Sequence, residues 1–71
     1  MEQAAVADGE RHLTPEDLSG RFGVPVKTVY DWNSKGTGPR YMKIGRHARY
    51  RLADVIAWEN DRYAETGGAA A

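Results

Sequence analysis

Cysteine is absent from the 71 residues of this chain, so neither a disulfide scaffold nor a thiolate zinc site can form. Long apolar runs are also absent: no stretch approaches the roughly 20 residues that a membrane-spanning helix needs, and the N-terminus lacks a basic and then apolar signal pattern. A chain this short makes one small domain near the lower limit for a hydrophobic core. We therefore expect a marginally stable cytoplasmic protein with no membrane partner.

A net charge is missing too, because ten Lys and Arg balance ten Asp and Glu. The charges are nevertheless separated along the chain. Residues 27–51 hold seven Lys or Arg and a single acid, whereas the rest of the chain holds three basic and nine acidic residues. A local basic tract is typical of proteins that contact phosphates, since neutralised phosphates release counterions whatever the net charge of the protein. A merely solvated basic face is the simpler alternative.

Catalytic and metal-binding patterns are missing as well. The sequence has no nucleophile beside a base, no paired carboxylates and no glycine loop of the kind that cradles phosphate. His12 has no second His, Cys or paired carboxylate at ligand spacing. We therefore expect no enzyme, no cofactor and no metal, and interpret His12 as an exposed side chain.

Start and stop signals predict a first helix that ends near Phe22. Thr14 is a candidate N-cap, Pro15 suits the first helical position, and Asp17 has the spacing of a capping box. Gly23 follows where a left-handed C-terminal residue is wanted. A tight turn at this glycine is therefore expected.

A second helix is predicted from Val26 to Lys35, after Pro25, with no breaker before Gly36. Val29 and Trp32 share one side of it and should face a core. The opposite side is polar, with Tyr30 near the border. That polar side carries Lys27, Thr28, Asp31, Ser34 and Lys35.

Two short strands are predicted next, over residues 41–44 and 48–51, joined by a connection over residues 45–47. A hairpin is not stable alone, so its apolar side should lie on the helices and leave a basic side and the tip free. This arrangement is a wing whose tip presents Arg46 and His47. Arg49 has two interpretations that stay open here: an ion pair with an acid of the last helix, or a phosphate contact.

A third helix is expected from Leu52 to about Tyr63. Its apolar stripe contains Leu52, Val55, Ile56 and Tyr63, and Trp58 widens the stripe as a core residue. The charged residue Glu59 lies inside this stripe, so the sequence does not determine where the side of the helix that faces the core ends. We expect a domain over residues 13–63, with a flexible leader over residues 1–12 and a flexible tail over residues 64–71.

Residues 13–62 resemble a known group of proteins in several short segments. The matching segments are Leu13-Thr14-Pro15-Glu16-Asp17-Leu18, Gly23-Val24-Pro25-Val26-Lys27-Thr28-Val29-Tyr30-Asp31-Trp32, Gly38-Pro39-Arg40-Tyr41, Lys43-Ile44-Gly45-Arg46, Arg49-Tyr50, and Asp54-Val55 with Trp58. In this order and spacing they are similar to the group that contains phage excisionases, AlpA-type regulators and the DNA-binding domains of the MerR superfamily.

The resemblance implies a winged helix-turn-helix: mainly α with a small β-hairpin, in the order α-α-β-β-α. It also implies that the second helix enters a major groove while the wing contacts backbone or a neighbouring minor groove. Two positions depart from the group. Pro25 replaces the usual Ser or Thr cap, and Asp31 stands where relatives often carry Arg or Lys.

The residues expected to bind DNA lie on the second helix and the wing. Lys27 and Thr28, near the helix start with Val26, should reach base edges or the first phosphates, and Asp31 can accept from a cytosine amino group. Tyr30 and Lys35 should touch backbone. Arg46 and His47 suit a minor groove. The remaining expected contacts, to phosphates, come from Arg40, Lys43 and Arg51, with Arg49 as a further candidate whose two interpretations stay open.

The preferred function is that of an excisionase, a recombination directionality factor that bends attachment-site DNA and directs an integrase of the tyrosine or serine class. Self-association on repeated sites would supply the contacts that offset the bending cost. A small AlpA-type transcriptional regulator is one alternative. A protein-interaction adaptor without DNA binding is the other.

Overall fold

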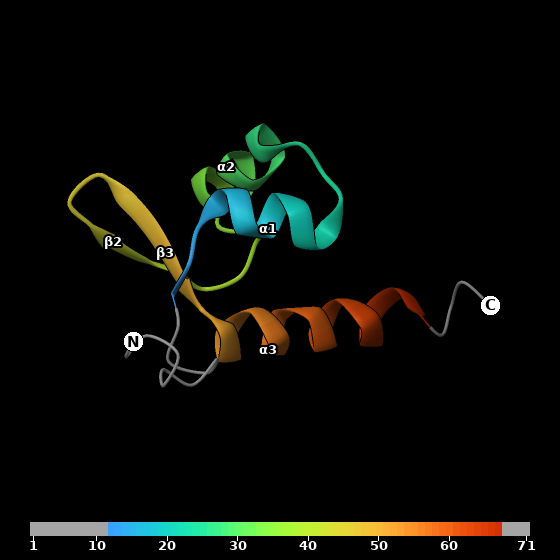
Figure 1. Cartoon of the computed structure of the whole chain (residues 1–71). Helices are drawn as coiled ribbons and strands as arrows, with labels where there is room; N and C mark the ends of the chain where they lie inside the picture. The colour runs from blue at the N-terminus through green and yellow to red at the C-terminus, as the bar shows by residue number, and fades with distance from the viewer. Residues whose placement is uncertain (1–11, 68–71) are drawn as a thin grey trace, which may run out of the picture.

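The computed structural model describes residues 12–67. Its elements are β1 (His12–Leu13), α1 (Pro15–Phe22), α2 (Val26–Lys35), β2 (Met42–Ile44), β3 (His47–Arg51), α3 (Leu52–Arg62) and the π-helical turn η3 (Tyr63–Gly67). Figure 1 shows α1 and α2 together on one side, α3 running beneath them, and the β2–β3 hairpin projecting away from the helices. The predicted winged helix-turn-helix fold is confirmed.

α1 begins and ends where the local signals predict. The Thr14 hydroxyl accepts from the backbone N–H of Asp17 at 3.0 Å, and the Asp17 carboxylate accepts from the backbone N–H of Thr14 at 2.9 Å. This completes the capping box. Gly23 has φ 68° and donates its N–H to the Ser19 carbonyl. Because L side chains rarely adopt that conformation, glycine is what lets the chain turn there toward α2.

α2 starts without a side-chain cap, as Pro25 predicts. Val29 is fully buried and Trp32 is half-buried, so the predicted core face is the one that packs. Lys27, Asp31 and Lys35 are exposed on the other side. The helix therefore presents a polar face over its whole length.

The core takes one residue from each of five elements. These are Leu13 of β1, Leu18 of α1, Val29 of α2, Tyr50 of β3 and Val55 of α3. Because β2 contributes no buried residue, the outer strand of the hairpin is held by strand pairing and not by core packing.

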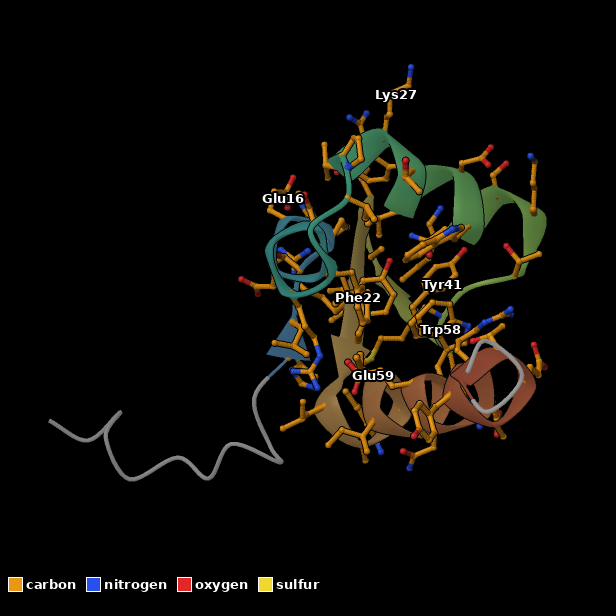
Figure 2. The ribbon with its side chains drawn as sticks, turned by 90° about the vertical axis from the view of Figure 1, so that its right-hand side faces the viewer. Glu16, Phe22, Lys27, Tyr41, Trp58 and Glu59 are labelled. Carbon is orange, nitrogen blue, oxygen red and sulfur yellow. The ribbon has the colours of Figure 1, made fainter. Side chains whose placement is uncertain are left out.

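Three aromatic rings join the helix pair to α3. The ring centroids of Phe22, Trp32 and Trp58 lie 5.0–5.9 Å apart in every pairing. Figure 2 shows Phe22 and Trp58 pointing into the space between the three helices. The Trp58 indole N–H also donates to the Thr37 carbonyl at 3.0 Å. Trp58 is thus half-buried and packs against the two other rings, outside the set of buried core residues.

The sheet has three strands in the order β1-β3-β2, all antiparallel. β1 is an addition to the predicted hairpin: His12 pairs with Arg51 and Leu13 with Tyr50. His12, interpreted as part of the leader, is therefore in a strand, with an exposed side chain. Residues 1–11 of the predicted leader lie outside the described residues.

The predicted connection over residues 45–47 is wrong by one residue. His47 belongs to β3 and pairs with Ile44, so only Gly45 and Arg46 form the turn. Gly45 has φ 66°, as the first position of a two-residue hairpin turn favours. The short turn follows from this pairing, and the wing tip presents Arg46 alone.

The apolar stripe predicted on α3 is also partly wrong. Val55 is buried and Leu52 half-buried, but Ile56 is 41% exposed and Tyr63 is 74% exposed. The stripe is instead shifted toward Trp58, because α3 docks through the aromatic rings of α1 and α2. Residues 63–67, partly assigned to the tail, form η3, and residues 68–71 lie outside the described part of the chain.

Candidate nucleic-acid interface

The exposed face of α2 carries a shallow hollow at its N-terminal half. Lys27, Thr28, Tyr30 and Asp31 line it. Figure 2 shows Lys27 projecting outward from the start of this helix. All four residues were predicted as DNA contacts, and the helix places them together because they fall on the polar face opposite Val29.

A larger groove of about 540 Å³ separates the helix pair from the hairpin. Five of the predicted residues line it: Tyr30, Lys43, Arg46, His47 and Arg49. Tyr30 also belongs to the first hollow. The two hollows are therefore neighbours, and Tyr30 lines both.

A third hollow, of about 310 Å³, lies at the base of the hairpin. Arg40, Arg49 and Arg51 line it together with Asp54. Arg49 also lines the groove beside α2. All the predicted residues except Val26 and Lys35 therefore line at least one of three neighbouring hollows over α2 and the hairpin.

The basic residues of the hairpin do not share one face, contrary to the prediction. Lys43 pairs with Ala48, next to the buried Tyr50, and so lies on the face toward the helices. Met42 pairs with Arg49 and lies on the opposite face. The apolar residues of β2 are thus on the outer face, because strand pairing and not residue type sets which side a residue takes.

Lys35 is held by an acid of its own helix. Its Nζ lies 3.1 Å from a carboxylate oxygen of Asp31, one turn earlier. The two charges largely cancel at this end of α2, so the acid at position 31 is compensated within the helix. Val26 is half-buried at the start of the helix.

A partly buried hydrogen bond holds Asn33, which lines the groove. The hydroxyl of Tyr50, which is fully buried, donates to the side-chain oxygen of Asn33 at 2.9 Å. Burial raises the pKa of Tyr50, so this hydroxyl stays protonated and remains a donor. The bond links β3 to α2 and so sets the distance between the wing and the helix that flank the groove.

Arg49 had two open interpretations, and the first is not observed. Its guanidinium Nη1 donates to the carbonyl of Ala48 at 2.7 Å, and within residues 12–67 it forms no ion pair with an acid of α3. The arginine that pairs with α3 is Arg21, which binds Glu59. Arg49 is therefore available to an external anion.

Several lining residues were missed by reasoning from the sequence. Tyr41 could have been found, because alternation places it on the same face as Lys43. Ser34 was placed on the polar side of α2 but was not named as a contact. Glu16 and Asp54 reach these hollows through the docking of α1 and α3, and Asn33 does so because α2 packs beside the hairpin.

Between residues 12 and 67 no three His, Cys, Asp or Glu side chains gather in a way that could hold a metal ion. Within the same residues no helix has the length and apolar character needed to cross a membrane.

Comparison with protein families gives one match. A family model described as a helix-turn-helix domain matches residues 13–63, well over half of the chain. No curated protein and no solved structure matches. Such domains bind double-stranded DNA and are typically not enzymes. The match supports DNA as the partner.

Proposed function

We propose that this chain, which belongs to the helix-turn-helix domain family, binds double-stranded DNA with α2 in a major groove and the hairpin against the adjacent backbone. The observation that carries the proposal is that the predicted residues, from Lys27 through Tyr30 to Arg46 and Arg51, line three neighbouring hollows over α2 and the hairpin. A polar helix face beside a basic wing fits a groove and the phosphates that border it.

The residues of α2 divide by their place on the helix. Lys27 and Thr28 lie in its first turn and reach base edges or the first phosphates, since the N-terminal part of a recognition helix is the part that contacts bases. Asp31 accepts a hydrogen bond from a cytosine amino group in the major groove. Tyr30, which lines two of the hollows, contacts backbone.

The hairpin supplies most of the electrostatic affinity. Arg46 at the two-residue turn, followed by His47, enters the neighbouring minor groove. Lys43 contacts a phosphate from the inner face of the hairpin, and Arg40, Arg49 and Arg51 do so from its base. Only Lys27 and the paired Lys35 are basic on α2. The helix therefore contributes mainly to sequence specificity, and the wing contributes mainly to affinity for the DNA backbone.

The biological role that we propose is excision of an integrated element. The protein binds side-by-side repeats at an attachment site, bends the DNA and assists a tyrosine or serine integrase in the cytoplasm. One DNA-binding domain of this size covers only a short site. Several copies bound side by side would supply the contacts that offset the cost of bending the DNA, which is a few kcal/mol. The resemblance of the sequence to excisionases supports this choice.

Binding is tested by gel shift and footprinting on the DNA that flanks the gene. The expected result is a shift at about 50 mM salt that weakens steeply as salt rises, with protection repeated at regular spacing. Failure to shift both the flanking duplex and a random duplex at that salt would favour the adaptor without DNA binding.

The role in excision needs a separate experiment. Deleting the gene and measuring excision of the element should lower excision, and adding purified protein to an integrase reaction on the two attachment sites should restore it. Unchanged excision together with altered transcription of neighbouring genes would favour the AlpA-type regulator.

A further inference from the structure

One carboxylate lies in the basic groove between the helix pair and the hairpin. Glu16, in the first turn of α1, lines the groove together with Lys43, Arg46 and His47. Figure 2 shows Glu16 projecting outward from α1. A negative charge at this place faces the same space into which a phosphate backbone would have to fit.

The position of Glu16 is set by the start of α1. The capping box between Thr14 and Asp17 holds the turn on both sides of it, and Pro15 is buried just before it. The hydroxyl of Tyr30 lies 3.4 Å from the Glu16 carboxylate, which is long for a hydrogen bond between oxygens. The Glu16 side chain thus lies beside Tyr30 and accepts at most a weak hydrogen bond from its hydroxyl.

Glu16 differs from Asp31, the acid that lines the hollow on α2. Asp31 is compensated by Lys35 at 3.1 Å. By contrast, among the residues that the structure describes, no Lys, Arg or His nitrogen forms an ion pair with Glu16. No direct ion pair therefore neutralises its charge, and a phosphate that enters the α1 end of the groove meets it. The usual role of an acid in the first turn of a helix is a modest stabilisation by the helix dipole, and that role does not require a place in a basic groove.

We propose that Glu16 is a specificity-determining residue that excludes phosphate from the α1 end of the groove and so sets the register of the DNA backbone along the wing. The inference rests on the proposed DNA binding. Like charges that meet across an interface suppress wrong partners and fix register. In the correct register the phosphates lie on Lys43 and Arg46, away from Glu16.

The repulsion between Glu16 and phosphate weakens non-specific complexes more than the specific complex. Non-specific binding depends on phosphate contacts alone, and the protein samples many registers along the duplex. Some of these registers bring a phosphate against Glu16. The specific complex is held in one register by base contacts of α2, so it meets this repulsion less. Glu16 therefore raises the ratio of specific to non-specific affinity.

The test measures the affinity of wild-type protein and Glu16→Gln for two duplexes over a series of salt concentrations. One duplex carries the footprinted site, and the other is a shuffled sequence of the same composition. Glutamine keeps an acceptor for Tyr30 and removes only the charge. We expect Glu16→Gln to bind the shuffled duplex about threefold to tenfold more tightly, with a steeper salt dependence, and to gain less on the site.

Two further variants separate charge from structure. Asp61→Asn removes one exposed carboxylate from α3, outside the groove, and should leave both affinities unchanged. Tyr30→Phe keeps the charge of Glu16 but removes the hydroxyl that contacts both Glu16 and, in the proposed complex, the DNA backbone, so it should weaken and not strengthen binding to the shuffled duplex. Thermal melts of each variant establish that the fold is retained.

The outcomes are distinct. Equal tightening on both duplexes, or no change on the shuffled one, would overturn the role of Glu16 while leaving DNA binding intact. The same strengthening in Asp61→Asn would also overturn it, because the effect would then come from net charge alone. If wild-type protein binds neither duplex, the proposed function itself fails.

Discussion

The guanidinium group of Arg21 in α1 donates two hydrogen bonds to the carboxylate of Glu59 in α3, with Nη2 to Oε1 at 2.9 Å and Nε to Oε2. The two residues are 38 positions apart in the chain. This pair explains why an acid lies beside the apolar stripe of α3, where it faces α1 and not solvent alone. It joins the first and last helices next to the aromatic rings.

The pair predicts a stability that depends on pH. The hydrogen bond from Arg21 lowers the pKa of Glu59, so the stabilisation is complete above the ordinary pKa of a glutamate and is lost as pH falls through the lower pKa of the folded state. The same hydrogen bond raises the pKa of Arg21, so Arg21 would lose its positive charge, and the ion pair with it, only at strongly alkaline pH.

Glu59→Gln tests this in thermal melts at pH 7 and pH 3. We expect a loss below about 1 kcal/mol at pH 7, because both side chains are about one-third exposed and solvent screens them. Acidification should therefore cost wild-type protein more stability than it costs the variant. Glu65→Gln, in the more exposed pair with Arg62, is the matched control. Parallel losses in wild type and Glu59→Gln would rule out the pair as the cause.

The basic residues of the wing are expected to set the salt dependence of DNA binding. Lys43→Ala and Arg46→Ala should each weaken binding to all sequences and lower the slope of log affinity against log salt by about one unit, the value for one lost phosphate contact. Arg62→Gln on α3 removes a cation away from the groove and should leave the slope unchanged. An unaltered slope in the wing variants would mean that the wing does not lie at the DNA.

The Asp31–Lys35 pair should restrain affinity and shape base preference. Asp31→Asn removes a repulsive charge and frees Lys35, so we expect tighter binding to all duplexes together with a changed order of preference among cytosine-containing variants of the site. In a Lys35→Met background the general tightening should be smaller, since no cation is freed. Equal tightening in both backgrounds would show that the pair does not act as a unit.

The aromatic contact between α2 and α3 should be essential for folding. Trp32→Ala removes a ring that touches both Phe22 and Trp58, and losses of about 3 kcal/mol are usual for such truncations. That is a large share of the stability of a small domain. Thermal melts monitored by circular dichroism should therefore show either no cooperative transition or a much lower melting temperature. Ile56→Ala, at an exposed position on α3, should melt close to wild type. A Trp32→Ala protein as stable as wild type would contradict the core face assigned to α2.

Local rules were enough for the helix pair. The capping box at Thr14, the left-handed Gly23 and the buried face of α2 each depend on residues within a few positions of one another, so their hydrogen bonds and spacing could be predicted without knowing the rest of the fold. The wing was predicted as a hairpin, but its turn was misplaced by one residue. Gly45 permits turns of more than one length, and only the Ile44–His47 pairing selects the shorter one.

The candidate interface was predicted in composition but not in arrangement. The basic tract identified Lys43, Arg46 and Arg49 as a group, yet strand register puts Lys43 on one face of the hairpin and Arg49 on the other. Glu16 gave no signal, because an acid in the first turn of a helix is ordinary. Its place in the groove depends on how α1 docks beside the wing.

By itself the sequence determined the order of the three helices and the hairpin, the limits of α1 and α2, and the concentration of positive charge from residue 27 to residue 51. These features follow from local backbone preferences and from composition, and the Asp31–Lys35 pair likewise follows from residues one turn apart on a helix. Only the tertiary structure decided that β1 joins the sheet, that Arg21 meets Glu59 and that Glu16 faces an open basic groove, because each of these depends on how separate elements dock.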